Sequence, residues 1–108
     1  MHKLAQDTLQ KFLFDGHPVR GMFVRLKATV EACFSERDYA PGTKTLLSEA
    51  MCATAILTGS IKFKGRLIFQ LQGDGLLRFL VSECDESFHM RALAMLDKVE
   101  DAKFPALV

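Results

Sequence analysis

The stretch QLQGDGLLRFLVSEC, from Gln70 to Cys84, decides the fold, because it places an alternating apolar and polar sequence on each side of a Gly-Asp-Gly turn. A phosphate-binding loop needs its glycines between a strand and a helix, where backbone N–H groups converge on the anion. Here both flanking segments alternate like strands, and Asp74 would repel a phosphate. The stretch therefore predicts a β-hairpin whose Asp and Gly residues tolerate positive φ at Gly73-Asp74-Gly75.

The same alternation extends beyond this hairpin. It begins at Arg66, and it returns from Phe88 to Ala94 after the polar link Asp85-Glu86-Ser87. Short links between consecutive strands favour antiparallel pairing. We therefore expect a three-strand meander over about residues 66–94.

A long helical segment, KTLLSEAMCATAILTGSIKF, precedes the meander. Its apolar residues cover nearly the whole circumference of a helix, which is typical of a helix inside a protein. Thr43 lies where an N-cap hydroxyl would be useful, and Gly59 or Gly65 would end the helix. The pattern predicts a largely buried central helix over about residues 43–61, with small residues that let a sheet approach closely.

The N-terminal third predicts a hairpin followed by a short helix. Asp7 to Phe14 is read as a strand, and Asp15-Gly16-His17-Pro18 breaks it. The partner strand runs to about Lys27, with a bend or bulge at Gly21. The segment Thr29 to Arg37 then changes to helical spacing. Together these elements predict an α+β fold with antiparallel sheets, as one domain over residues 1–108.

Length, charge and cysteine content exclude several classes of protein. The chain has 108 residues, 49% of them hydrophobic, and 14 basic side chains against 13 acidic ones. This balance does not favour nucleic acid or an anionic membrane surface as a partner. The longest uncharged run, Ala50 to Ile61, has 12 residues, too few for a membrane helix. The N-terminus lacks a secretory signal, so we expect a cytoplasmic protein with reduced thiols.

No catalytic or metal-binding constellation stands out. Cys52 is expected to be a small buried hydrophobic residue. Cys84 and His89 would form a nucleophilic pair only if their side chains met across the link after Glu83. No third group is evident to orient the histidine. The possible ligands His2, His17, His89, Cys33, Cys52 and Cys84 form no close pair, so no metal site is predicted. The carboxylates Glu31, Glu36, Glu49, Glu83 and Glu86 show no catalytic spacing.

Two further features concern the surface. Lys62, Lys64 and Arg66 are read as a solvated strand edge that discourages the addition of another strand. The chain has nine Phe and five Met, more apolar material than a small domain easily buries. Part of it therefore forms either a binding surface or an interface with missing segments. Phe12, Phe14 and Phe23 would contribute to binding only if they are exposed, and the alternative is that they belong to the core.

The order of the segments carries a resemblance. DTLQKFLFD, PVRGMFVRL, TLLSEAMCATAILTGSIKFKGRLIFQLQGDG, VSEC and MRALA, in this order, resemble the N-terminal domain of the redox-regulated 33-kilodalton heat-shock chaperone family of bacteria. The resemblance runs from about Asp7 to Ala94. Its most specific parts are Lys62-Phe63-Lys64-Gly65 leading into Gln70–Gly75, and Val19-Arg20-Gly21. Ser48 and Leu76 depart from the family pattern, which usually has Gly and Pro there.

The resemblance implies an ATP-independent holdase that captures unfolding proteins under oxidative and heat stress. In that family a separate C-terminal region binds zinc through cysteines in C-x-C and C-x-x-C pairs, and their oxidation releases zinc and yields an active dimer. The cysteines Cys33, Cys52 and Cys84 do not match that pattern, so we expect no zinc in these residues. Since the chain ends on an apolar tail, we also expect it to be an N-terminal piece without the zinc region. The alternatives are an oligomerisation module that ignores clients and a cysteine-dependent enzyme.

Overall fold

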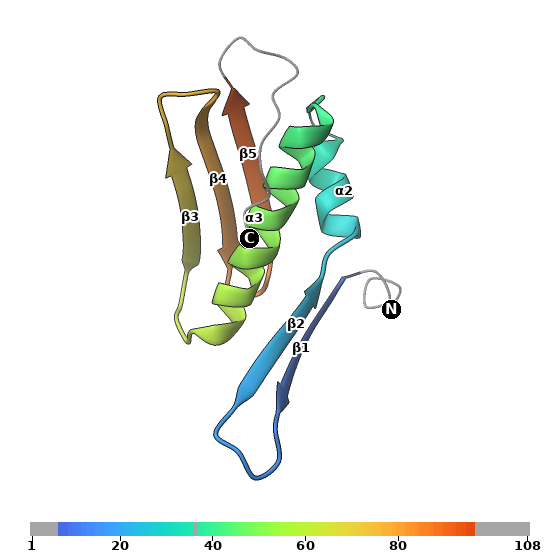
Figure 1. Cartoon of the computed structure of the whole chain (residues 1–108), viewed down its shortest axis with the longest axis vertical. Helices are drawn as coiled ribbons and strands as arrows, with labels where there is room; N and C mark the ends of the chain where they lie inside the picture. Colours follow the sequence, from blue (N-terminus) through green and yellow to red (C-terminus); the bar gives the residue numbers. More distant parts are fainter. Residues whose placement is uncertain (1–6, 36, 97–108) are drawn as a thin grey trace.

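The computed structural model describes residues 7–35 and 37–96. His2, Glu36 and the apolar tail after Leu96 lie outside these residues. The elements are β1 (Thr8–Leu13), β2 (Arg20–Arg25), α2 (Ala28–Phe34), α3 (Pro41–Ser60), β3 (Arg66–Gln72), β4 (Leu77–Asp85) and β5 (Met90–Leu96). They form a two-stranded sheet, a three-stranded sheet and two helices (Figure 1), which confirms the α+β prediction.

The three-strand meander predicted from residues 66–94 is confirmed. The strands pair antiparallel in the order β3-β4-β5, with Phe69 opposite Ser82 and Ser82 opposite Ala92. The Gly-Asp-Gly stretch joins β3 to β4, and the Gly73 N–H donates to the Arg78 carbonyl at 3.3 Å. It is therefore a hairpin turn.

The conformation of that turn differs from the prediction in one respect. Among the described residues, positive φ occurs at Gly16, Gly65 and Phe88, so Gly73 and Gly75 do not have it. Gly73 is needed for space instead, because a Cβ there would lie 2.9 Å from the Leu77 carbonyl oxygen.

Helix α3 lies against one face of the three-stranded sheet (Figure 1). Its buried residues include Leu47, Ala50, Met51 and Ala55, which confirms a largely buried helix with small residues where the sheet approaches. Leu47 and Ala50 join Tyr39, Leu46, Leu80 and Ala94 in the core.

The start of α3 corrects the prediction for Thr43. The N-cap residue is Ala40 and Pro41 is the first helical residue, where its fixed φ suits a helix and its missing N–H costs nothing. Thr43 is instead fully buried in the first turn, and its hydroxyl has no hydrogen-bond partner among the described residues. The helix ends at Ser60, next to one of the two glycines expected to end it.

The β1–β2 hairpin extends away from the rest of the molecule (Figure 1). With the hairpin included, the molecule measures 51 × 31 × 25 Å. Of the bend or bulge expected at Gly21, the bulge is wrong, since the pairing is regular and Gly21 lies opposite Phe12. The Phe12 ring covers the Gly21 backbone, and this close packing explains the glycine.

The hairpin is connected to α2 through Asp7. Its carboxylate accepts hydrogen bonds from the backbone N–H groups of Lys27 and Ala28, at 2.7 and 2.8 Å, and from the N–H and hydroxyl of Thr29. These bonds satisfy N–H groups that a helix leaves free at its first turn.

Candidate functional site

The face of the three-stranded sheet that points away from α3 is the candidate site, and we call it the outer face. Cross-strand partners share a face, and the buried row Leu71, Leu80 and Ala94 points toward α3. The intervening rows therefore point outward. They are Ile68 with Glu83 and Arg91, then Gln70 with Val81 and Leu93, then Gln72 with Phe79 and Met95.

Apolar side chains dominate the outer face. Ile68 is 53% exposed and Met95 is 51% exposed. The row that holds Val81 and Leu93 separates the row of Ile68 from the row of Met95. Val81 and Leu93, in this middle row, and Phe79, in the row of Met95, are half-buried. A face of this kind, with no described element covering it, can bury apolar groups of another molecule.

Charged residues bound this apolar area at one end. Glu83 Oε1 lies 3.3 Å from Arg66 Nη1 and 3.0 Å from Arg91 Nη2, so one carboxylate joins all three strands. Exposed ion pairs contribute little to stability, about 0–1 kcal/mol each. Here they fix the positions of long side chains beside Ile68, which lies in the same row as Glu83.

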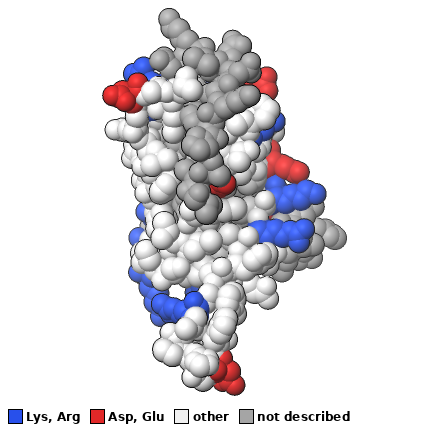
Figure 2. Space-filling view, viewed as in Figure 1, with Lys and Arg blue, Asp and Glu red and all other residues white. Residues whose placement is uncertain are grey.

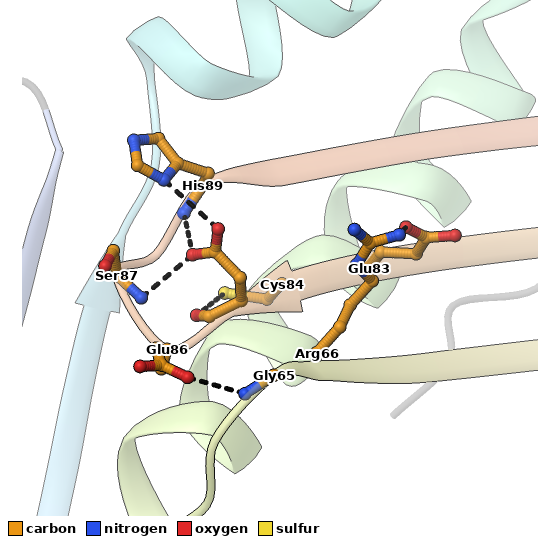
Figure 3. A network of polar contacts seen from close by, with 8 residues as sticks. Gly65, Arg66, Glu83, Cys84, Glu86, Ser87 and His89 are labelled. Atoms are coloured by element: carbon orange, nitrogen blue, oxygen red, sulfur yellow. Dashed lines mark hydrogen bonds and ion pairs between the residues drawn. The ribbon is translucent and has the colours of Figure 1, made fainter.

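Asp85 organises the turn after β4, and the polar contacts of this turn are drawn in Figure 3. Its Oδ1 accepts the N–H groups of Ser87 at 2.8 Å and His89 at 2.9 Å, and its Oδ2 lies 3.2 Å from His89 Nδ1. The hydrogen bond from the His89 backbone is the main reason that the pKa of Asp85 is lowered, with the Ser87 N–H and the His89 imidazole adding to it. Phe88 completes the turn in a left-handed conformation, with φ of 65°.

The structure does not bring Cys84 and His89 together as a nucleophilic pair. Cys84 is fully buried and its Sγ lies 3.6 Å from the Asp85 carbonyl oxygen, whereas the His89 side chain is 83% exposed. In Figure 3 a dashed line joins the His89 imidazole to a carboxylate, and none joins it to Cys84. Burial raises the pKa of the Cys84 thiol, although a hydrogen bond with Thr58 opposes this. A group that orients the histidine is thus present, but no accessible thiolate faces it.

The prediction that Cys52 lies in the core is wrong. Cys52, expected in the core, is only half-buried, while Cys84 is enclosed. Cys33 Sγ lies 3.3 Å from the Ala92 carbonyl oxygen. Burial, and to a lesser degree Glu49, raises the pKa of Cys52. Within residues 7–35 and 37–96, no three His, Cys, Asp or Glu side chains are grouped as a metal site would require.

The remaining predicted residues are dispersed. Glu31 lies on α2 and Glu49 on α3, Glu83 binds arginines, and Glu86 accepts the Gly65 N–H (Figure 3). The structure therefore does not assemble the carboxylates into an acid–base pair. Lys62, Lys64 and Arg66 are exposed next to or on β3, an edge strand of the described sheet, as expected for a solvated edge.

The aromatic residues of the hairpin are on the surface. Phe12, Phe14 and Phe23 are 47%, 53% and 54% exposed, so the alternative that they belong to the core is wrong. A binding role for these three residues required that they be exposed, and they are. The outer face itself was not identified from the sequence, although the period-two pattern that defines its rows was present.

Comparisons with known proteins give one consistent result. The family model described as Hsp33 protein matches residues 7–107. Curated relatives, each named 33 kDa chaperonin, come from Chromobacterium violaceum at 42% identity over 103 residues, Sodalis glossinidius at 40% over 105 residues and Shewanella denitrificans at 36% over 107 residues. The matches cover 95%, 95% and 97% of this chain and 35%, 36% and 37% of the relatives. The chain thus spans about a third of the length of these relatives. Among the described residues, no helix is long and apolar enough to cross a membrane.

Proposed function

Because the chain belongs to the Hsp33 protein family, we propose that it is the N-terminal, client-binding part of an ATP-independent holdase chaperone. Such a protein binds unfolding proteins under heat and oxidative stress and keeps them from aggregating. The relatives carry the name 33 kDa chaperonin, which supports a chaperone role, and the part of each that this chain matches is about a third of its length.

The observation that carries the proposal is the apolar outer face. An unfolding client exposes apolar segments, and covering them with apolar surface gains roughly 25 cal/mol per Å². Burying the half-exposed side chains of Ile68 and Met95 would contribute roughly 1 kcal/mol each. Phe79, Val81 and Leu93 extend this area between them. Phe12, Phe14 and Phe23 on the hairpin supply further aromatic surface for the same task.

Binding of this kind needs no reaction chemistry, which suits a protein that is not an enzyme. Cys84 is enclosed and His89 is engaged by Asp85. The opposing hypothesis of a cysteine-dependent enzyme requires that alkylation of Cys84 abolish activity. We regard redox regulation, zinc binding and dimerisation as properties of the longer protein, and the cytoplasm as its location.

The test is light scattering from a thermally unfolding client, with and without the purified chain, in reductant and without nucleotide. Suppression at near-stoichiometric ratio supports the proposal. If the chain is folded by circular dichroism and associates with itself but does not suppress scattering, the oligomerisation module replaces it.

A further inference from the structure

A groove between the β1–β2 hairpin and the C-terminal end of α3 is distinct from the outer face. It has a volume of about 700 Å³, within the range of roughly 300–1,000 Å³ typical of ligand sites. Leu9 and Met22 of the hairpin pack near Gly59 of α3, and beyond this contact the two elements diverge. The hairpin therefore forms one wall and the last turn of α3 the other.

The groove combines apolar walls with a single sign of charge. Its apolar lining includes Phe12, Leu13, Met22, Ile56 and Ile61, and Leu13 is 78% exposed. Its charged lining residues are Lys11, Arg20 and Lys62, with no carboxylate. None of these three cations forms an ion pair with another described residue. Figure 2 shows Lys and Arg side chains gathered at the lower left, where the hairpin meets the body of the molecule.

The register of the hairpin explains why the charges converge. Lys11 pairs with Met22 and Leu13 pairs with Arg20, and these four side chains alternate with Phe12 and Gly21 along the strands. They therefore share the face that carries Leu9 and Met22 toward α3. Lys62 lies two residues after the last residue of α3 and supplies the third cation from the opposite wall.

The C-terminal end of α3 determines which kind of anionic ligand fits the groove. The last carbonyl groups of a helix lack intrahelical partners, and Gly59 and Ser60 line the groove. A simple fatty acid offers no donor for these carbonyls, and the helix dipole there disfavours a bare anion. A peptide supplies N–H donors for the carbonyls, apolar side chains for the walls and carboxylates for the three cations.

We propose that this groove binds an extended peptide segment in which acidic and apolar side chains alternate. The inference rests on the proposed function only for the source of such a segment, which would be a client protein. It gives the chain a sequence preference that the apolar outer face alone would not provide.

The test is fluorescence anisotropy with three labelled peptides of equal length, in which Leu and Phe alternate with Glu, Gln or Lys. We expect the Glu peptide to bind at least about tenfold more tightly than the Gln peptide, with an affinity that falls as salt rises. The variant Lys11→Gln/Arg20→Gln/Lys62→Gln should lose this advantage. The matched control Lys27→Gln/Arg37→Gln/Lys64→Gln removes the same number of charges outside the groove and should retain it.

Equal binding of the three peptides, or an equal loss in the control variant, would overturn the inference. Lys62→Glu, a single reversal of an exposed charge, gives the same answer if the triple variant fails to fold. The light-scattering assay with an unfolding client tests the holdase proposal separately. If the chain suppresses client scattering but shows no preference for the Glu peptide, peptide binding in the groove is refuted and the holdase proposal stands. If the chain prefers the Glu peptide but does not suppress scattering, the groove proposal stands and the holdase proposal is refuted.

Discussion

The ring of Phe12 lies directly over the backbone of Gly21 on the neighbouring strand, so closely that a Cβ at Gly21 would be 2.2 Å from the ring's Cζ. The ring covers a position that has no side chain of its own, in a hairpin that is exposed on most of its surface. A two-stranded hairpin is only marginally stable alone. This contact therefore matters for whether the hairpin keeps its shape.

Gly21→Ala should destabilise the chain by roughly 0.5–1.5 kcal/mol, because the half-exposed Phe12 ring has to leave its rotamer to admit the methyl group. Urea unfolding measures the loss. Gly75→Ala is the control, since nothing lies within 4 Å of a Cβ there and its φ is not positive. In the background Phe12→Ala, the cost of Gly21→Ala should shrink. An undiminished cost would show that the ring is not its cause.

Asp7→Asn should weaken the connection between the hairpin and α2. Partial burial tends to raise the pKa of Asp7, but the hydrogen bonds from the Thr29 hydroxyl and from the N–H groups of Lys27, Ala28 and Thr29 lower it below its ordinary value of 3.8. A carboxylate with a lowered pKa stabilises the folded state above its unfolded pKa, and this stabilisation is lost as the pH falls through the folded pKa.

The substitution should therefore cost about 1 kcal/mol at pH 7, as for other helix N-terminal caps. The difference should begin to shrink as the pH falls below about 4, and it should vanish once the pH lies below the lowered pKa of the folded state. Urea titrations of both proteins at several pH values measure this. Asp74→Asn, in the exposed turn, is the control. A pH-independent difference would mean that the charge of Asp7 is not what stabilises α2.

Much of the fold was predictable because local patterns specify it. The period-two stretches around Gly73–Gly75 gave the meander, and the apolar run after Thr43 gave the helix. The contacts of Asp7 and Phe12 were not predictable, since each depends on a partner in another element. The start of α3 was misjudged because Thr43 was chosen as the N-cap for its hydroxyl group, whereas the helix begins two residues earlier at Pro41, and a proline suits the first turn of a helix.

The candidate site was predictable only in part. Alternation separates the two faces of β3, β4 and β5, but it does not say which face a helix covers. That choice follows from the packing of α3 against Leu80 and Ala94, which no local pattern contains. The exposure of Phe12 and Phe23 likewise depends on the direction in which the hairpin extends from the body.

Phe88→Gly should stabilise the protein by about 1 kcal/mol. Phe88 has a φ of 65°, a conformation that costs a residue with a Cβ roughly 1–2 kcal/mol and costs glycine much less. The gain is reduced by the loss of the partly buried ring. Thermal unfolding measures the effect, with Phe88→Ala as the comparison that removes the ring and keeps the strain. Equal stability of the two variants would contradict the explanation.

Cys84 should resist alkylation while the protein is folded. Its side chain is fully buried and its thiol has a raised pKa, so reaction requires an opening of the core. We expect labelling by iodoacetamide at least about 100-fold slower than in denaturant, with half-buried Cys52 labelled faster. Mass spectrometry after tryptic digestion assigns the rates. Rapid labelling of Cys84 that depends on His89 would instead support the hypothesis that the two residues form a nucleophilic pair.

The most direct test of the account is client light scattering with Ile68→Lys/Met95→Lys, which places charges on the outer face. Leu57→Lys is the control for adding a charge elsewhere, because Leu57 is also an exposed apolar residue but lies on α3. We expect the chain and the control to suppress scattering at near-stoichiometric ratio, and the double variant, folded by circular dichroism, to lose most of this suppression. Full suppression by the folded double variant would show that clients bind elsewhere.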